Sequence, residues 1–316
     1  MRYVLFTDNL ADLTVAEACR AAKRAGFDGL DLTVRPGGHV PPDRAEVGLA
    51  AARRAADEAG VDIPMISTAI TDADSPAAEA IFAAAAHYGA RRLKLGYWEY
   101  QPFGTLAAQI DQARARLRRV VALGKKYHVL PCVHCHSGRF VTSGGPLLYL
   151  VLKDFAPDEV GAYVDPMHMT IEGGRSVWEM GLDLLGPWVA LVGLKNFRWL
   201  PDRRDAAGQQ RFRWEYCPLA DGMAPLPEFL GYLRQLKYDG LVSLHSEYKG
   251  ESSFRKLDTP ALLEQSAADL RYVKRLAGAG GESGPEVVGL IRKEDHRAVT
   301  RPRRPDRRRP RPMRPG

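Results

Sequence analysis

The sequence is poor in cysteine and has no apolar run of membrane length, and both features narrow the class of protein. The 316 residues include four cysteines, which is too few for the disulfide framework of a small secreted domain. The apolar residues 3–6 follow Met1 and Arg2 directly and are too short for the core of a secretory signal. No other apolar run approaches the roughly 20 residues of a membrane span. We therefore expect a cytoplasmic protein that does not cross a membrane.

The body of the chain carries no net charge, although the whole sequence has a formal charge of +7. Residues 301–316 contain eight Arg and one Asp, and the remaining residues are balanced at 37 basic and 37 acidic side chains. A nucleic-acid-binding domain would concentrate basic residues in its folded part. We therefore consider nucleic acid an unlikely partner of the body and interpret the tail as an appendage.

A second CxxC pair is also absent, although Cys132 and Cys135 form one such pair. A single pair on a short apolar run is more typical of buried thiols than of a zinc or redox site, because free cysteine behaves as a small core residue. We therefore do not assign these two cysteines to a metal.

Short apolar runs alternate with helical segments from residue 3 to about residue 276, and this alternation predicts the fold. Eight such units favour a (β/α)8 TIM barrel, expected as one domain over residues 1–277. An open doubly wound sheet is the alternative, but the first strand-to-helix turn, residues 8–12, has no glycine-rich phosphate loop. Residues 278–316 read as a glycine-rich linker and an Arg/Pro-rich tail that we expect to be disordered. The predicted strands are residues 3–6, 29–33, 63–68, 92–95, 129–134, 161–164, 189–195 and 241–245.

Polar side chains follow several of these predicted strands at their carboxyl ends. In a TIM barrel all these ends meet at one mouth, which is where active sites are built. Side chains two residues apart on a strand share a face, so His134 with His136, and His245 with Glu247, can point the same way. The full set of candidates is His134, His136, Asp165, His168, Lys195, Asn196, His245 and Glu247, with Lys94 and Tyr97 after the fourth strand.

At these strand ends the sequence resembles the sugar phosphate isomerase/epimerase group of xylose isomerase-like TIM barrels. The resemblance covers about residues 3–276. Four motifs carry it in the expected order: residues 25–32 before and along the second strand, residues 133–138 at the fifth, residues 165–168 (Asp-Pro-Met-His) at the sixth, and residues 238–240 (Tyr-Asp-Gly) before the last.

The resemblance implies a divalent metal held by a Glu, the Asp of the Asp-x-x-His motif, a His and a last-strand Glu. Here Asp165 matches its position, whereas His134 and His245 stand where the two Glu would be and Gly193 replaces the His. The implied ligands are therefore His134, Asp165 and His245, with Glu247 or water completing the site. Such a set suits manganese, zinc or cobalt better than magnesium. A metal-free site, with His transferring protons and Lys195 and Asn196 stabilising an oxyanion, is the alternative.

The same resemblance implies an isomerase, an epimerase or a related lyase that acts on a sugar, a sugar phosphate or a keto-sugar. The reaction would begin with removal of a proton next to a carbonyl, for which the ordinary histidine pKa of about 6.5 is suited. We predict catalytic roles for His134, His245, Glu247 and Lys195, and substrate contacts for His136, His168, Asn196, Lys94 and Tyr97. The partner would be a small carbohydrate, and a homo-oligomer is expected because group members are often dimers or tetramers.

Two other functions remain open from the sequence. One is a metal-dependent phosphodiesterase like the endonuclease branch of the same superfamily, although strand seven and strand three offer few of the extra ligands that it needs. The other is a barrel that binds a carbohydrate without converting it, which the replacement of the group's two Glu and one His would allow.

Overall fold

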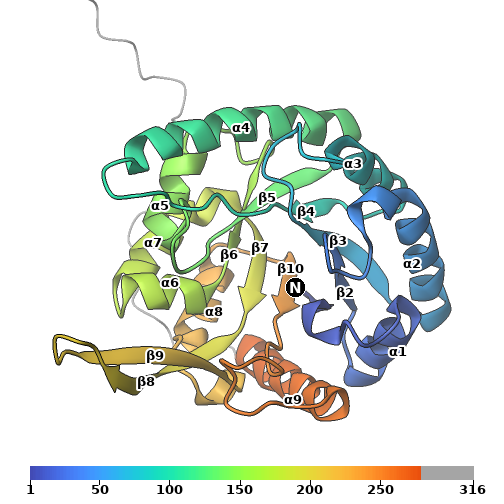
Figure 1. The fold of residues 1–316 in the computed structure, drawn as a ribbon. Helices are drawn as coiled ribbons and strands as arrows, with labels where there is room; N and C mark the ends of the chain where they lie inside the picture. Colours follow the sequence, from blue (N-terminus) through green and yellow to red (C-terminus); the bar gives the residue numbers. More distant parts are fainter. Residues whose placement is uncertain (279–316) are drawn as a thin grey trace, which may run out of the picture. The chain divides into compact units, whose positions relative to one another are not determined.

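Eight parallel strands close into a barrel in the computed structural model, which describes residues 1–278 (Figure 1). Strand β1 pairs with β10 through the register Tyr3↔Val242, and this pairing closes the sheet. The (β/α)8 prediction is therefore confirmed and the open sheet is wrong. The predicted tail over 278–316 lies almost wholly outside the described residues. The barrel strands are β1 (Arg2–Phe6), β2 (Gly29–Val34), β3 (Asp62–Thr68), β4 (Arg92–Lys94), β5 (Leu130–His134), β6 (Gly161–Val164), β7 (Val189–Leu194) and β10 (Leu241–Leu244).

The helices form the outer layer around the barrel (Figure 1). Helix α1 begins at a capping box, in which Glu17 N–H donates to the Thr14 hydroxyl and the Glu17 carboxylate accepts from Thr14 N–H. It ends at Gly26, whose φ of 88° is a left-handed conformation that favours glycine. The α-helices are α1 (Val15–Ala25), α2 (Ala45–Ala59), α3 (Ala78–His87), α4 (Leu106–Tyr127), α5 (Gly144–Leu152), α6 (Pro166–Gly173), α7 (Val177–Leu185), α8 (Leu226–Gln235) and α9 (Thr259–Gly278).

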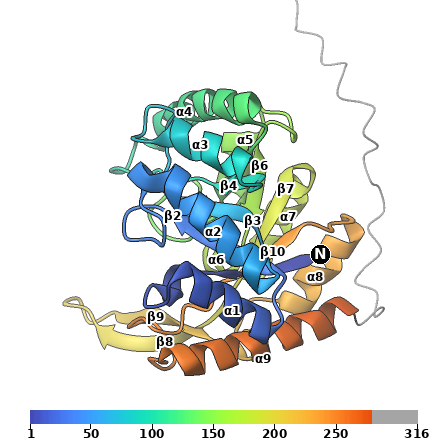
Figure 2. The same ribbon diagram turned by 90° about the vertical axis from the view of Figure 1, so that its right-hand side faces the viewer.

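Two elements have no counterpart in the sequence prediction. Helix α6 begins directly after β6, at the Asp-Pro-Met-His motif of residues 165–168. A two-stranded antiparallel hairpin, β8 (Asn196–Arg204) and β9 (Gln210–Cys217), lies between β7 and α8. The hairpin projects beyond the helices of the barrel (Figure 2). The alternation of aromatic and polar residues along its two strands is hard to recognise in the sequence, because one face of the hairpin is rich in arginine.

The barrel interior is built in layers by the period-two alternation of strand side chains. One buried layer is apolar and forms a separate cluster inside the barrel, with Val4, Met65, Cys132, Leu191 and Leu241. Two residues further along the same strands, toward their carboxyl ends, stand Phe6, Ser67, His134, Gly193 and Ser243. The barrel interior therefore has an apolar layer and, nearer the carboxyl ends of the strands, a layer of mostly polar residues. A larger apolar cluster fills the space between the barrel and its helices.

No helix within residues 1–278 is long and apolar enough to cross a membrane. The four cysteines are free and buried, as expected from the sequence. Burial raises the pKa of the Cys132 thiol to about 12, so this side chain stays protonated and behaves as part of the core.

Candidate active site

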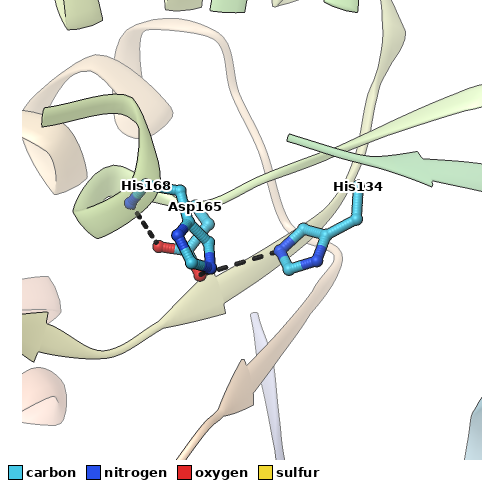
Figure 3. Close-up of side chains that lie close together, drawn as sticks. All are labelled: His134, Asp165 and His168. Atoms are coloured by element: carbon cyan, nitrogen blue, oxygen red, sulfur yellow. Dashed lines mark hydrogen bonds and ion pairs between the residues drawn. The ribbon is translucent and has the colours of Figure 1, made fainter. Parts of the chain in front are cut away.

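Three buried side chains point at one another at the carboxyl ends of β5 and β6. The Oδ2 atom of Asp165 lies 3.7 Å from Nε2 of His134 and 3.8 Å from Nε2 of His168. Figure 3 shows both imidazole rings turned toward this carboxylate. The three ligand-type atoms lie within 4.8 Å of one another, which is a spacing that one metal ion can bridge. We call His134, Asp165 and His168 the ligand triad.

Asp165 has two functions at this point of the chain. Its Oδ1 accepts the backbone N–H groups of Met167 at 2.9 Å and His168 at 3.2 Å, which caps helix α6. Pro166 occupies the first helical turn, where its missing N–H costs nothing. Asp165 is therefore a helix cap that leaves its Oδ2 directed at the two imidazoles.

The two imidazoles are held from behind through their Nδ1 atoms. Nδ1 of His168 lies 2.8 Å from the Ser137 hydroxyl, and Nδ1 of His134 lies 3.0 Å from the Tyr97 hydroxyl. Both hydroxyl oxygens can accept a hydrogen bond from Nδ1–H, which leaves the Nε2 lone pair available for a ligand. Such supporting hydrogen bonds fix the orientation of metal-binding histidines.

The atoms that face the centre of the ligand triad have no hydrogen-bond partner among residues 1–278. Seven buried side-chain nitrogen or oxygen atoms of the described chain lack such a partner, and they include Nε2 of His134, Oδ2 of Asp165 and Nε2 of His168. An unsatisfied buried polar atom costs about 1–3 kcal/mol, so three at one point are unfavourable without a ligand. The donor set of two imidazoles and one carboxylate therefore fits a divalent metal.

Burial keeps the triad histidines neutral. It is the largest cause that lowers the pKa of both His134 and His168 well below 6.5, and the nearby charges of His136 and Lys195 add to the effect. Burial also raises the pKa of Asp165 to about 7. The expectation that these imidazoles titrate near their ordinary pKa is therefore wrong. Neutral imidazole is the form that binds metal.

His245 belongs to a second buried network instead of the ligand triad. Its Nε2 lies 2.7 Å from the Tyr163 hydroxyl, which in turn donates to Asp31 Oδ2 at 3.4 Å. The Asp31 carboxylate also accepts from the hydroxyls of Ser67 and Ser243, both at 2.9 Å. Burial raises the pKa of Asp31 to about 6. Within the described residues, the group with metal-binding spacing therefore contains His168 and does not contain His245, which the resemblance implies as a ligand.

Lys195 and Glu247 form an ion pair at the edge of the triad. Nζ of Lys195 lies 2.8 Å from Glu247 Oε1 and 3.9 Å from Asp165 Oδ2. Burial alone would raise the pKa of Glu247, but the charge and hydrogen bond of Lys195 outweigh it, so this pKa is lowered. Glu247 is therefore ionised at neutral pH. Its Oε1 also lies 3.8 Å from Nδ1 of His245, which places both predicted last-strand residues together.

Lys94 and Tyr97 close the opposite side of the site. Nζ of Lys94 lies 3.7 Å from the centre of the Tyr97 ring. Burial, followed by the charge of Arg35, lowers the pKa of Lys94 to about 7. A lysine with this pKa can give or take a proton at neutral pH. Lys94 therefore has acid/base capacity in addition to the substrate contact predicted from the sequence.

The remaining two candidates differ in their placement. His136 lies at the mouth with its ring centre 3.8 Å from that of His168, and its Nδ1 contacts the Ser137 carbonyl at 2.7 Å. Asn196 is buried away from the triad, and its amide contacts the Leu219 carbonyl and the N–H groups of Phe197 and Ala224. The predicted oxyanion role of Asn196 is therefore not supported, because its polar atoms hold the base of the hairpin.

Gly193 stands directly beside the triad. A Cβ atom built on it would lie 3.2 Å from Asp165 Oδ2 and 3.2 Å from the Tyr163 ring. This position is therefore directed at the site, as the resemblance implies, but the chain offers no ligand there. The nearest cation on the same strand face is Lys195, two residues further along.

Four contributors to the site do not emerge from the sequence alone. Asp31, Tyr163 and Tyr216 all lie in or against it, and Phe6 stacks on His245 with ring centres 4.3 Å apart. Asp31 carries a usable signal, because a lone carboxylate in the apolar run Gly29–Val34 must be hydrogen-bonded when buried. The tyrosines carry no comparable signal, since aromatic residues are common in ordinary strands.

The family model described as xylose isomerase-like TIM barrel matches residues 19–275. The chain belongs to this family. No curated protein sequence matches the chain significantly. The resemblance identified at the strand ends is therefore confirmed at the level of the family.

Solved structures with the same fold are similar to this xylose isomerase-like barrel at low sequence identity. D-psicose 3-epimerase from Clostridium cellulolyticum H10, with D-tagatose, is 12% identical with a TM-score of 0.64 over 88% of this chain and 99% of that chain. A xylose isomerase-like TIM barrel protein from Mycobacterium smegmatis in complex with magnesium is 16% identical with a TM-score of 0.66 over 87% and 96%. A probable 3-DHS dehydratase from Bacillus anthracis is 16% identical with a TM-score of 0.63 over 87% and 99%. These likenesses concern the fold.

Proposed function

We propose that this protein is a metal-assisted enzyme that moves a proton at the carbon next to the carbonyl of a keto-sugar or a related polyhydroxy ketone. The observation that carries the proposal is the convergence of three buried, unpartnered ligand atoms in the triad His134, Asp165 and His168. The placement of an ionised carboxylate and two buried lysines around the triad supports it. Isomerases, epimerases and dehydrating lyases share this first step, and the D-psicose 3-epimerase fold neighbour is one such enzyme.

The chain's own residues supply the proton chemistry. Glu247 is the proposed base, since Lys195 keeps it ionised and only 21% of its side chain is exposed. His245 lies beside Glu247, with Nδ1 3.8 Å from Glu247 Oε1, and the Tyr163 hydroxyl holds the imidazole through Nε2. Lys94 is the proposed acid on the other side of the site, because its pKa of about 7 allows both protonation states.

The ligand triad would hold a divalent ion of the manganese, zinc or cobalt type. When bound, such an ion polarises a carbonyl oxygen and stabilises the negative charge that develops on it. Lys195 lies close enough to Asp165 to contribute positive charge at the same place. His136, at the mouth, is placed to contact a substrate hydroxyl.

Metal content and hydrogen exchange together test the proposal. Protein purified without added metal or a polyhistidine tag should contain about one transition metal per chain by elemental mass spectrometry. In deuterated buffer, a panel of keto-sugars should include at least one whose C–H next to the carbonyl exchanges, as followed by NMR. The Asp165→Ala variant should lose both properties. A metal-free wild-type protein that stays so after incubation with manganese, cobalt and zinc would exclude metal assistance.

A metal-dependent phosphodiesterase is the less favoured function. Enzymes of that kind hold two or more metals about 3.5–4 Å apart. Within residues 1–278 a single group of three His, Cys, Asp or Glu side chains has metal-binding spacing. The region that the structure describes therefore supports one metal better than several.

A further inference from the structure

The β8–β9 hairpin has one aromatic face and one charged face. The register pairs Phe197 with Tyr216, Trp199 with Trp214, and Pro201 with Phe212. Directly opposed residues and residues two apart on a strand share a face, so these six side chains form one surface, which we call the aromatic ladder. The other face carries Asn196, Arg198, Leu200, Arg213, Glu215 and Cys217.

The ladder becomes more exposed from its base to its tip. Phe197 is buried at 1% exposure, whereas Trp199 is 41% exposed and Phe212 is 62% exposed. Aromatic side chains contribute much binding energy when a ligand covers them. Exposed aromatic side chains that gather on one face therefore mark a binding surface. The charged face is already satisfied, because Glu215 pairs with Arg198 at 2.6 Å and with Arg213 at 3.4 Å. Among residues 1–278, the outer part of the aromatic face, at Trp199 and Phe212, is therefore the exposed apolar side of the hairpin.

The base of the ladder lies at the mouth of the candidate active site. Nζ of Lys195 lies 5.6 Å from the centre of the Tyr216 ring, and the same Nζ pairs with Glu247. The ring of Trp214 contacts that of Tyr216 with centres 4.7 Å apart. Successive rungs on one face of a strand are about 7 Å apart, so the two outer rungs extend roughly 14 Å from Tyr216. The aromatic surface is therefore continuous with the place where the substrate reacts.

We propose that the aromatic ladder binds the second ring of a glycoside whose first ring reacts at the ligand triad. A pyranose ring presents a face of C–H groups that pack on the electron-rich face of an aromatic ring. Its hydroxyls point outward from that face to water, which suits a surface that is half exposed. The substrate class is therefore a disaccharide or another glycoside and not a free monosaccharide. This inference rests on the proposed function for the nature of the reacting ring.

Equilibrium binding to the full-length protein tests the inference. The probes are disaccharides whose reducing ring is a ketose, such as glucosyl- and galactosyl-fructoses, each compared with its component monosaccharides by isothermal titration calorimetry. We expect at least one disaccharide to bind roughly tenfold more tightly than its monosaccharides, the scale of one or two aromatic contacts. The double variant Trp199→Ala/Phe212→Ala should lose this preference and keep the monosaccharide affinity. The matched control Leu200→Ala/Arg213→Ala, on the charged face, should keep both.

Three results would overturn the inference. The first is that no disaccharide binds more tightly than its monosaccharides. The second is that the Trp199→Ala/Phe212→Ala variant retains the preference. The third is that this variant dissociates from an oligomer to a monomer in sedimentation analysis while sugar binding is unchanged, in which case the ladder is an interface between copies of the chain.

The binding measurement is independent of turnover, so it separates this inference from the proposed function. A protein that prefers disaccharides but exchanges no C–H of any keto-sugar keeps the ladder site and loses the proposed reaction. A protein that exchanges the C–H of monosaccharides but shows no preference for disaccharides keeps the proposed reaction and loses the ladder site.

Discussion

The barrel holds two buried histidine–carboxylate clusters, and they differ in how many hydrogen bonds their carboxylates make. In the ligand triad, the facing atoms of His134, Asp165 and His168 have no partner within the described residues. In the second network, by contrast, the Asp31 carboxylate accepts three hydroxyl groups. Tyr163 binds Nε2 of His245, and only Nδ1 of that ring lacks a hydrogen-bond partner within the described residues. Buried histidine and aspartate side chains of the same kind can therefore have different roles in the two clusters. The Asp31 carboxylate, with its hydrogen bonds satisfied, positions its neighbours, whereas the Asp165 carboxylate and the two facing imidazoles have atoms left for a ligand.

Replacing Asp165 by Asn should have the largest effect. An Asn side chain can still cap helix α6 through its oxygen, so the far-UV circular dichroism spectrum should not change. The replacement removes the charge that faces both imidazoles. We therefore expect metal affinity and the rate of C–H exchange to fall at least about a hundredfold, beyond the usual loss from a supporting residue. Elemental analysis and deuterium exchange measure the two quantities, and full activity of the variant would remove Asp165 from the site.

Replacing one histidine of each cluster by glutamine tests the comparison between the two clusters directly. The His168→Gln variant should lose bound metal, because it removes a triad ligand. The His245→Gln variant should retain metal and lose most of the exchange rate, because His245 contacts Glu247 and Tyr163 instead. Equal loss of metal in both variants would return His245 to the ligand set that the resemblance implies. Metal content by elemental mass spectrometry, beside exchange rates by NMR, distinguishes these outcomes.

Strand periodicity explains why so much of the site can be predicted from the sequence. His134, Asp165, His245 and Glu247 each follow a short apolar strand, and the carboxyl ends of parallel strands meet at one mouth whatever the details of packing. The choice between His168 and His245 as a ligand is not predictable in this way. It depends on which ring nitrogen Ser137 or Tyr163 occupies, and these contacts join segments far apart in the sequence.

The hairpin shows a second limit of prediction from sequence. Its aromatic and charged residues alternate through Asn196–Arg204 and Gln210–Cys217, but the pairing between the strands depends on the turn that joins them. Without that register, the sequence does not show that the aromatic residues lie on one face of the hairpin. The sequence also predicts a substrate contact for Asn196, because it does not show that the Asn196 amide binds the backbone carbonyl of Leu219.

The second network should make stability depend on pH through Asp31. Burial raises its folded-state pKa from 3.8 to about 6, so the folded protein prefers the protonated acid. The stabilisation is fully present below about pH 3.8 and is lost as the pH rises through about 6. Between pH 4.5 and 7.5 the wild-type protein should lose about 2 kcal/mol that the Asp31→Asn variant does not lose. Urea unfolding of both proteins in chelator, at both pH values, measures this difference; parallel losses would mean that Asp31 is not protonated in the folded state.

The smallest predicted effect concerns the support of the triad from behind. The Ser137 hydroxyl lies 2.8 Å from Nδ1 of His168 and fixes which ring nitrogen faces the carboxylate. The Ser137→Ala variant should weaken metal binding about tenfold, the lower range for a supporting hydrogen bond of a metal-binding histidine. The Ser143→Ala variant is the matched control, since the buried hydroxyl of Ser143 has no partner within the described residues. Competition with a chelating dye measures both affinities. If the two variants bind metal equally well, His168 does not depend on Ser137 for its orientation, and the contrast between the two clusters rests on Asp165 and His134 alone.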